Sequence, residues 1–98
     1  MSQDPNCIFC KIASGQIPSN TFYQDDDVIA FHDIRPAAPV HFLIVPREHI
    51  PMLQDCTERH QALLGKMLTL APKLMAEQGV TNGFRVVINN GQAGGQEV

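Results

Sequence analysis

The chain has 98 residues, of which 44% are hydrophobic and 17% charged, and its formal net charge is −3. This length and composition fit one small globular domain with a single core and argue against a disordered chain. No basic run is present, which argues against nucleic acid as a partner, and no apolar stretch approaches the roughly 18 residues of a membrane span. The polar start, Met1–Pro5, lacks the features of a secretion signal. Together with three cysteines, an odd number, it favours reduced thiols and a cytoplasmic location.

The first elements are expected to be a short helix and a hairpin. Residues 7–14 favour a helix or turn, which Gly15 and Pro18 interrupt. Two strand-like runs, 21–24 and 28–31, flank three consecutive aspartates. Aspartate favours turns, so the pattern predicts an antiparallel hairpin.

The middle of the chain predicts a strand and then one long helix. Residues 40–45 are mostly apolar, which indicates a strand buried on both faces and ended by Pro46. Asp55 or Thr57 is a candidate N-cap for the helix. Its expected buried face has helical 3/4 spacing and comprises Leu63, Leu64, Met67, Leu68, Ala71, Leu74 and Met75.

Two residues bear on the shape and end of this helix. Pro72 should kink or split it, because proline removes a backbone hydrogen bond. Gly79 is a suitable residue just beyond the C-terminus.

A last strand is expected over residues 84–88, and a further strand after Val98. The order strand-strand-strand-helix-strand predicts an α+β fold. This would be an antiparallel sheet of about five strands when complete, with one long helix and a short N-terminal helix. Residues 1–98 would form one domain.

Asp33 is the first candidate for a binding residue. It follows a strand and precedes a proline-rich loop, where an exposed carboxylate could accept bonds from two ribose hydroxyls. Phe31 and Ile34 beside it, with Phe9 and Ile12, could enclose a base. Chemistry alone favours the plainer alternative, in which Asp33 starts a turn and the apolar residues belong to the core.

The glycine-rich segment 89–98 is the second candidate. Gly91, Gly94 and Gly95 can adopt positive φ and let backbone N–H groups approach an anion closely. A Gly-Gly loop is also consistent with an ordinary hairpin that carries a glycine bulge.

Cysteine and histidine supply a third candidate. Cys7 and Cys10 have the C-x-x-C spacing of a zinc chelate, and His49 could add a ligand. The two cysteines could instead be a redox pair or simply buried side chains, although no βαβ pattern surrounds them. His41 lies alone in an apolar strand, where a core histidine is more common than a catalyst.

Three segments taken together resemble the histidine triad (HIT) family, in its branch of small nucleotide-binding phosphoramidases. They are Phe31-His32-Asp33-Ile34, Pro39-Val40-His41-Phe42-Leu43-Ile44-Val45-Pro46 and the segment 89–98. In that family a His-x-His-x-His motif follows the Gly-Gly-Gln segment, and this chain ends shortly before it. We therefore expect a fragment that lacks the triad strand. The alternative is a complete nucleotide-binding or interaction module without catalysis.

The resemblance implies a nucleotide site. Asp33 would bind the ribose. Glu97 departs from the serine often found there in eukaryotic relatives, and because a carboxylate repels phosphate, our hypothesis is that it contacts a cationic leaving group. The residues expected to line the site are Phe9, Ile12, Phe31, His32, Asp33, Ile34, Asn89, Gly95, Gln96 and Glu97. The last four belong to the loop that would contact phosphate or other parts of the nucleotide, where N–H donors stabilise developing charge.

The resemblance also implies a reaction and an assembly. The triad's middle histidine attacks the α-phosphorus of a purine nucleoside phosphoramidate or acyl-adenylate, and water then releases the monophosphate. No catalytic metal is required, no catalytic residue lies in this chain, and His41 would orient the triad. Structural zinc would bind Cys7, Cys10, His49 and the triad's first histidine. Relatives are homodimers.

Overall fold

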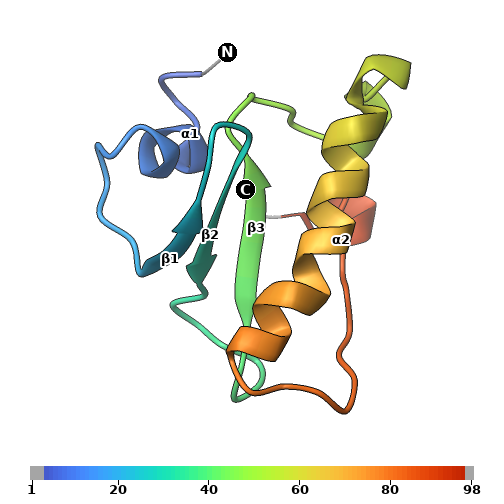
Figure 1. Cartoon of the computed structure of the whole chain (residues 1–98). Helices are drawn as coiled ribbons and strands as arrows, with labels where there is room; N and C mark the ends of the chain where they lie inside the picture. Colours follow the sequence, from blue (N-terminus) through green and yellow to red (C-terminus); the bar gives the residue numbers. More distant parts are fainter. Residues whose placement is uncertain (1–3, 97–98) are drawn as a thin grey trace. The chain divides into compact units, whose positions relative to one another are not determined.

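The computed structural model describes residues 4–96 and divides the chain into two units, residues 1–49 and 50–98 (Figure 1). It contains a three-stranded sheet and one long helix, which confirms the α+β class. Within residues 4–96, every helix is too short or too polar to cross a membrane.

The first unit contains a short helix and an antiparallel sheet. Helix α1 spans Ile8–Ala13, and strands β1, β2 and β3 span Thr21–Gln24, Val28–His32 and Phe42–Pro46, in the order β1-β2-β3. The expected hairpin is confirmed. Asp25 explains its turn, because one carboxylate oxygen accepts the N–H groups of both Asp27 and Val28.

Strand β2 lies at the centre of this sheet. Its first four residues are all buried, whereas only Val45 is buried in β3. The expectation that residues 40–45 are buried on both faces is therefore wrong, since the side chains of β3 other than Val45 all keep some solvent exposure. Ile29 and Phe31 form a core cluster with Ala13 of α1 and Val45.

Arg47 connects three segments of the first unit. Its Nε donates to the Asp25 carbonyl at 2.6 Å, and its Nη1 donates to the Ala13 carbonyl at 2.7 Å. Its Nη2 donates to the Gln24 side chain at 2.9 Å. One guanidinium therefore joins the residue after β3 to the end of α1 and to the hairpin.

The second unit contains helix α2, Gln61–Glu77. Asp55 and Thr57 do not cap α2 directly, because short 3-10 helices, Leu53–Asp55 and Glu58–His60, precede it. The Thr57 N–H donates to His60 Nδ1 at 2.9 Å, so a buried histidine satisfies a backbone donor just before α2.

Helix α2 runs without interruption through Pro72, so the expected split is wrong. Pro72 is exposed, and so is Leu68, whose carbonyl loses its usual partner and can be hydrated instead. The buried residues of α2 are Leu70, Ala71 and Leu74, so the expected buried face is confirmed only in part.

The helix ends as expected at Gly79. Gly79 has φ +84°, its N–H donates to the Ala76 carbonyl, and the Val80 N–H donates to the Met75 carbonyl at 2.9 Å. These two bonds form a Schellman motif, in which glycine adopts the left-handed conformation.

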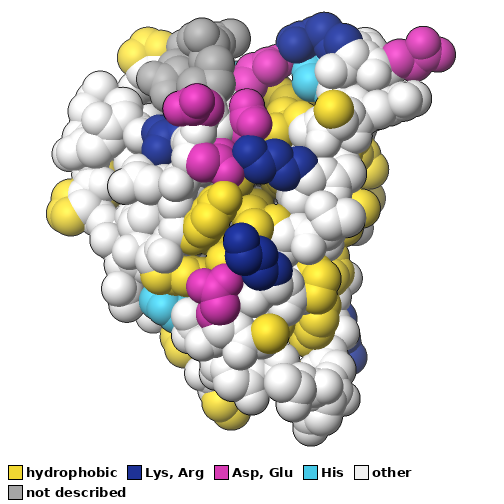
Figure 2. All heavy atoms as spheres, viewed as in Figure 1, with side chains coloured by type: hydrophobic (Ala, Val, Ile, Leu, Met, Phe, Trp, Pro, Cys, Tyr) yellow, Lys and Arg dark blue, Asp and Glu magenta, His cyan; other side chains and the backbone are white. Residues whose placement is uncertain are grey.

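Residues 84–88 form no strand, which corrects the sequence-based expectation. Phe84, Val86, Val87 and Ile88 are 42–64% exposed, and no residue of this segment has a ladder partner among residues 4–96. A strand-like sequence becomes a strand only when another strand accepts its hydrogen bonds. Hydrophobic side chains also reach the surface on the face drawn in Figure 2.

The Arg47 contacts predict a loss of stability on truncation. Arg47→Ala should lower the free energy of unfolding by about 2 kcal/mol, because three acceptors lose a charged donor. Arg35→Ala removes the same side chain from an exposed loop position and should change stability by less than about 0.5 kcal/mol. Urea denaturation of both variants measures the difference, and equal unfolding midpoints would contradict the role of Arg47.

Candidate functional site

Three of the four apolar residues of the predicted base pocket, Phe9, Ile12 and Phe31, pack together in the first unit. The rings of Phe9 and Phe31 are 6.1 Å apart at 46°, and Phe9 and Ile12 pack against the core cluster. Phe31 is 5% exposed and therefore lies in the core, beneath Phe9 and Ile12. Ile34 is 90% exposed and is not a core residue. α1 and the end of β2 therefore present apolar groups beside the loop that carries Asp33.

Asp33 lies directly after β2, and its carboxylate makes two contacts. Oδ1 accepts the Arg35 N–H at 2.8 Å, and Oδ2 lies 3.4 Å from His41 Nε2. Asp33 therefore does start a turn, as the plainer interpretation expected. Both side chains keep a solvent-accessible fraction, 23% for Asp33 and 33% for His41, so a ligand can still reach the carboxylate.

The tautomer of His41 follows from its other contact. The Ala37 N–H donates to His41 Nδ1 at 2.9 Å, so Nδ1 is the acceptor and a neutral ring carries its proton on Nε2. Nε2–H then faces Asp33. The sequence did not reveal this pair. The loop between Asp33 and His41 folds back, so that the side chains at its two ends contact each other.

His32 alternates away from Phe31, as expected for neighbours on a strand. Its ring stacks on Phe22 with centroids 4.6 Å apart, and Phe22 meets Phe42 edge to face at 5.0 Å. The surroundings of His32 in the first unit are thus aromatic.

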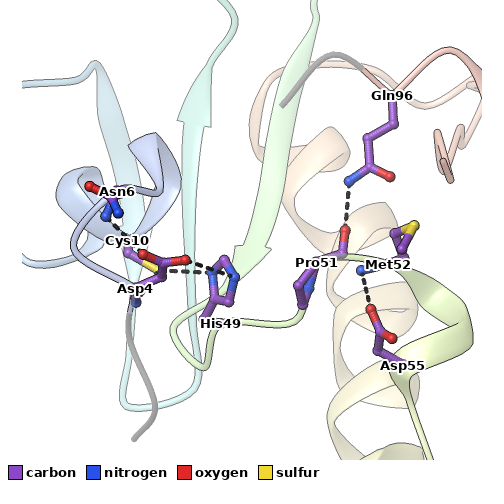
Figure 3. A network of polar contacts seen from close by, with 8 residues as sticks. All are labelled: Asp4, Asn6, Cys10, His49, Pro51, Met52, Asp55 and Gln96. Atoms are coloured by element: carbon purple, nitrogen blue, oxygen red, sulfur yellow. Dashed lines mark hydrogen bonds and ion pairs between the residues drawn. The ribbon is translucent and has the colours of Figure 1, made fainter. Parts of the chain in front are cut away.

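The glycine-rich loop of the second unit is held by hydrogen bonds within the loop and to Pro51. Gly91 and Gly95 have φ +72° and +79°, so the expected positive φ is found at these two glycines but not at Gly94. The Gln96 side chain accepts the Gly91 N–H at 2.6 Å. Its amide nitrogen also donates to the Pro51 carbonyl at 2.6 Å (Figure 3). Asn89 and Gly95 are exposed. Glu97 lies outside the described residues.

Asn90 is a residue of this loop that sequence reasoning missed. Its side-chain oxygen accepts the Leu53 N–H at 2.6 Å, and its amide nitrogen donates to the Gln54 side chain. No local pattern marks these contacts, because the two partners lie 37 and 36 positions away in the sequence. Asn90 therefore anchors the loop and leaves Asn89 exposed.

Cys7, Cys10 and His49 come together as the sequence predicted. Their ligand atoms lie within 4.8 Å of one another, Cys10 is buried, and the other two are half-buried. Cys10 Sγ lies 3.3 Å from His49 Nδ1 (Figure 3). Two sulfurs and an imidazole nitrogen at this spacing fit the donor set of a zinc ion.

The electrostatics of this cluster favour a protonated Cys10 in the absence of metal. Burial raises the pKa of the Cys10 thiol, and a hydrogen bond from the Asp4 backbone N–H partly opposes that effect. A bound cation would reverse this preference, because metals bind the thiolate.

Comparison with known proteins gives one family. The family model described as "Scavenger mRNA decapping enzyme C-term binding" matches residues 6–98. The purine nucleoside phosphoramidase of Escherichia coli (strain K12) is 46% identical over 92 residues, which are 93% of this chain and 77% of that protein.

Solved structures agree with this family. The structure of a HIT family hydrolase from Legionella pneumophila Philadelphia 1 has a TM-score of 0.92 and 45% sequence identity to this chain. The match covers 95% of this chain and 84% of the hydrolase chain. A Zn-bound histidine triad family protein from Mycobacterium smegmatis has a TM-score of 0.81 and 30% sequence identity. The match covers 95% of this chain and 68% of the Mycobacterium smegmatis chain. The chain therefore belongs to the histidine triad (HIT) family.

Proposed function

We propose that this chain is the nucleotide-binding part of a purine nucleoside phosphoramidase. The observation that carries the proposal is its 46% identity to the Escherichia coli enzyme of that name over nearly the whole chain. Such an enzyme cleaves the P–N bond of a nucleoside 5′-phosphoramidate, or the P–O bond between the acyl group and the phosphate of an acyl-adenylate. The amine or the acid leaves, and water then releases the monophosphate.

The geometry of the first unit supports a nucleotide ligand. Asp33 is held at one oxygen by the Arg35 N–H and faced by His41 at the other, so its carboxylate is oriented before any ligand arrives. Ribose hydroxyls are suitable donors to such a carboxylate. Phe9, Ile12 and the exposed Ile34 offer apolar surface for the base.

The family resemblance extends the proposal to the loop of the second unit. Asn89, Gly95 and Gln96 would donate to phosphate oxygens, with Glu97 placed toward the leaving group. Backbone and amide N–H groups suit that role because they stabilise charge without a proton transfer. Gln96 would exchange its present bonds to Gly91 and Pro51 for the ligand.

Catalysis needs a nucleophile beyond the histidines of this chain. They are His32, His41, His49 and His60, and none has a second histidine two positions away. A form that carries the His-x-His-x-His motif would attack the phosphorus with the middle histidine. The 98 residues by themselves would bind nucleotides without turnover, which is the second candidate function.

We extend the proposal to metal and assembly. Cys7, Cys10 and His49 would hold structural zinc, which joins α1 to the residues after β3 and takes no part in the reaction. Exposed apolar side chains at residues 84–88 support a homodimer, and the three free cysteines support a cytoplasmic location.

Asp33 offers a direct test of nucleotide binding. Asp33→Asn keeps an oxygen for the Arg35 N–H but loses one ribose acceptor, so the affinity for AMP should fall about tenfold. Calorimetric titration measures the change. Asp26→Asn, at an exposed position of the hairpin turn, removes the same charge and should leave AMP binding unchanged. Equal affinities of Asp33→Asn and wild type would contradict the proposed site.

The proposed zinc site predicts a pattern of cysteine protection. Zinc should slow alkylation of Cys7 and Cys10 by iodoacetamide at least tenfold, because metal-bound thiolates are shielded. Cys56 is half-buried like Cys7 and outside the cluster, so it serves as an internal control and should react at the same rate with or without zinc. Peptide mass spectrometry measures each rate, and equal zinc effects on all three would refute the site.

A further inference from the structure

The two ring nitrogens of His49 face different partners. Nδ1 lies 3.3 Å from Cys10 Sγ, and Nε2 lies 3.7 Å from Asp4 Oδ2 (Figure 3). Asp4 is not among the three residues whose ligand atoms cluster, and it approaches the ring at the nitrogen that does not face Cys10. Its contact therefore acts on the histidine and is not part of the predicted ligand set.

The short segment before α1 holds the Asp4 side chain in place. Asp4 Oδ1 accepts the Asn6 N–H at 2.8 Å, while its backbone carbonyl accepts the Cys7 N–H at 3.1 Å. Its backbone N–H points to Cys10 Sγ at 3.4 Å. With Oδ1 engaged in this turn, Oδ2 is the oxygen that remains for His49.

These contacts select one tautomer of His49. A proton on Nε2 faces the carboxylate and leaves the Nδ1 lone pair directed at Cys10. The opposite tautomer would place a lone pair against a negative oxygen, and it would block the nitrogen that faces the sulfurs.

We propose that Asp4 is a positioning residue that holds His49 as the Nε2-protonated tautomer, so that Nδ1 joins the Cys7 and Cys10 sulfurs as a metal ligand. The proposal rests on the zinc site proposed above. A carboxylate behind a metal-bound histidine fixes the ring and raises the basicity of the ligand nitrogen. The sequence motif of two cysteines and a histidine thus extends to a fourth residue, three positions before the first cysteine.

Asp4→Asn is the variant that separates this role from a role in folding. The amide oxygen can still accept the Asn6 N–H, which preserves the turn, and the amide nitrogen then faces His49 Nε2. Because that nitrogen is a donor, it disfavours a proton on Nε2. Asp26→Asn is the matched control, since it removes one charge at an exposed position outside the cluster.

Two measurements on the 98-residue chain test whether Asp4 sets the tautomer of His49. The first is a long-range ¹H–¹⁵N spectrum of the metal-free protein at about pH 8, where an ordinary histidine is neutral. It should show His49 protonated on Nε2 in wild type and Asp26→Asn, and shifted toward the Nδ1 tautomer in Asp4→Asn. The second is zinc affinity by chelator competition, which should fall about 10- to 100-fold in Asp4→Asn alone.

The outcomes distinguish the inference from the site on which it rests. A wild-type chain that does not bind zinc would overturn the metal site and, with it, the role of Asp4. Zinc binding by wild type with an unchanged affinity or an unchanged tautomer in Asp4→Asn would overturn the role of Asp4 alone. An equal loss of affinity in Asp26→Asn would reduce the effect to net charge and would also overturn it.

Discussion

The first unit depends on the Arg47 guanidinium, because it satisfies acceptors from segments that are far apart in the sequence. The carbonyl of Ala13 ends α1, the carbonyl of Asp25 begins the hairpin turn, and both are bonded from the residue after β3. Backbone carbonyls at such ends have no regular partner, so a charged donor in a fixed planar geometry is an effective substitute. This constraint keeps α1 beside the end of β3, where Cys10 meets His49.

Strand β3 connects the two candidate sites of the first unit. His41 immediately precedes it and faces Asp33, and His49 follows it and faces the cysteines. Because β3 pairs in register with β2 from His32↔Phe42 to Val28↔Pro46, both histidines are placed by the same ladder. In each case a carboxylate lies at the Nε2 side of the ring and another partner at Nδ1, which orients the imidazole without a bound ligand.

Local patterns predicted the elements that depend on neighbours in the sequence. The aspartate run predicted the hairpin turn, Gly79 predicted the end of α2, and the C-x-x-C pair with His49 predicted the metal cluster. Residues 84–88 were misread because a strand requires a partner, which a local pattern cannot supply. The split expected at Pro72 was wrong, because the cost of an interior proline depends on whether the freed carbonyl reaches water, whereas the expected kink stays a prediction.

Contacts that span the unit were beyond sequence reasoning. Neither the Arg47 bonds nor the Asp33–His41 pair is marked by a motif, since each depends on how loops fold back over 8 to 34 positions. Asp4 was also missed, because an aspartate in a polar segment is normally interpreted as solvated. The family resemblance supplied the roles proposed for single residues, and the structure supplied the contacts that hold those residues in place.

The most direct test of this account is a ¹H–¹⁵N amide spectrum of the chain during titration with AMP. Nucleotide binding at Asp33 predicts the largest shifts at Phe31 to Ile34 and at Ala37, whose N–H reports on His41. The residues around Cys10 and His49, which would hold the metal, should shift little. Shifts confined to that cluster, or no shifts at millimolar AMP, would contradict the assignment of Asp33 and His41 to a nucleotide site.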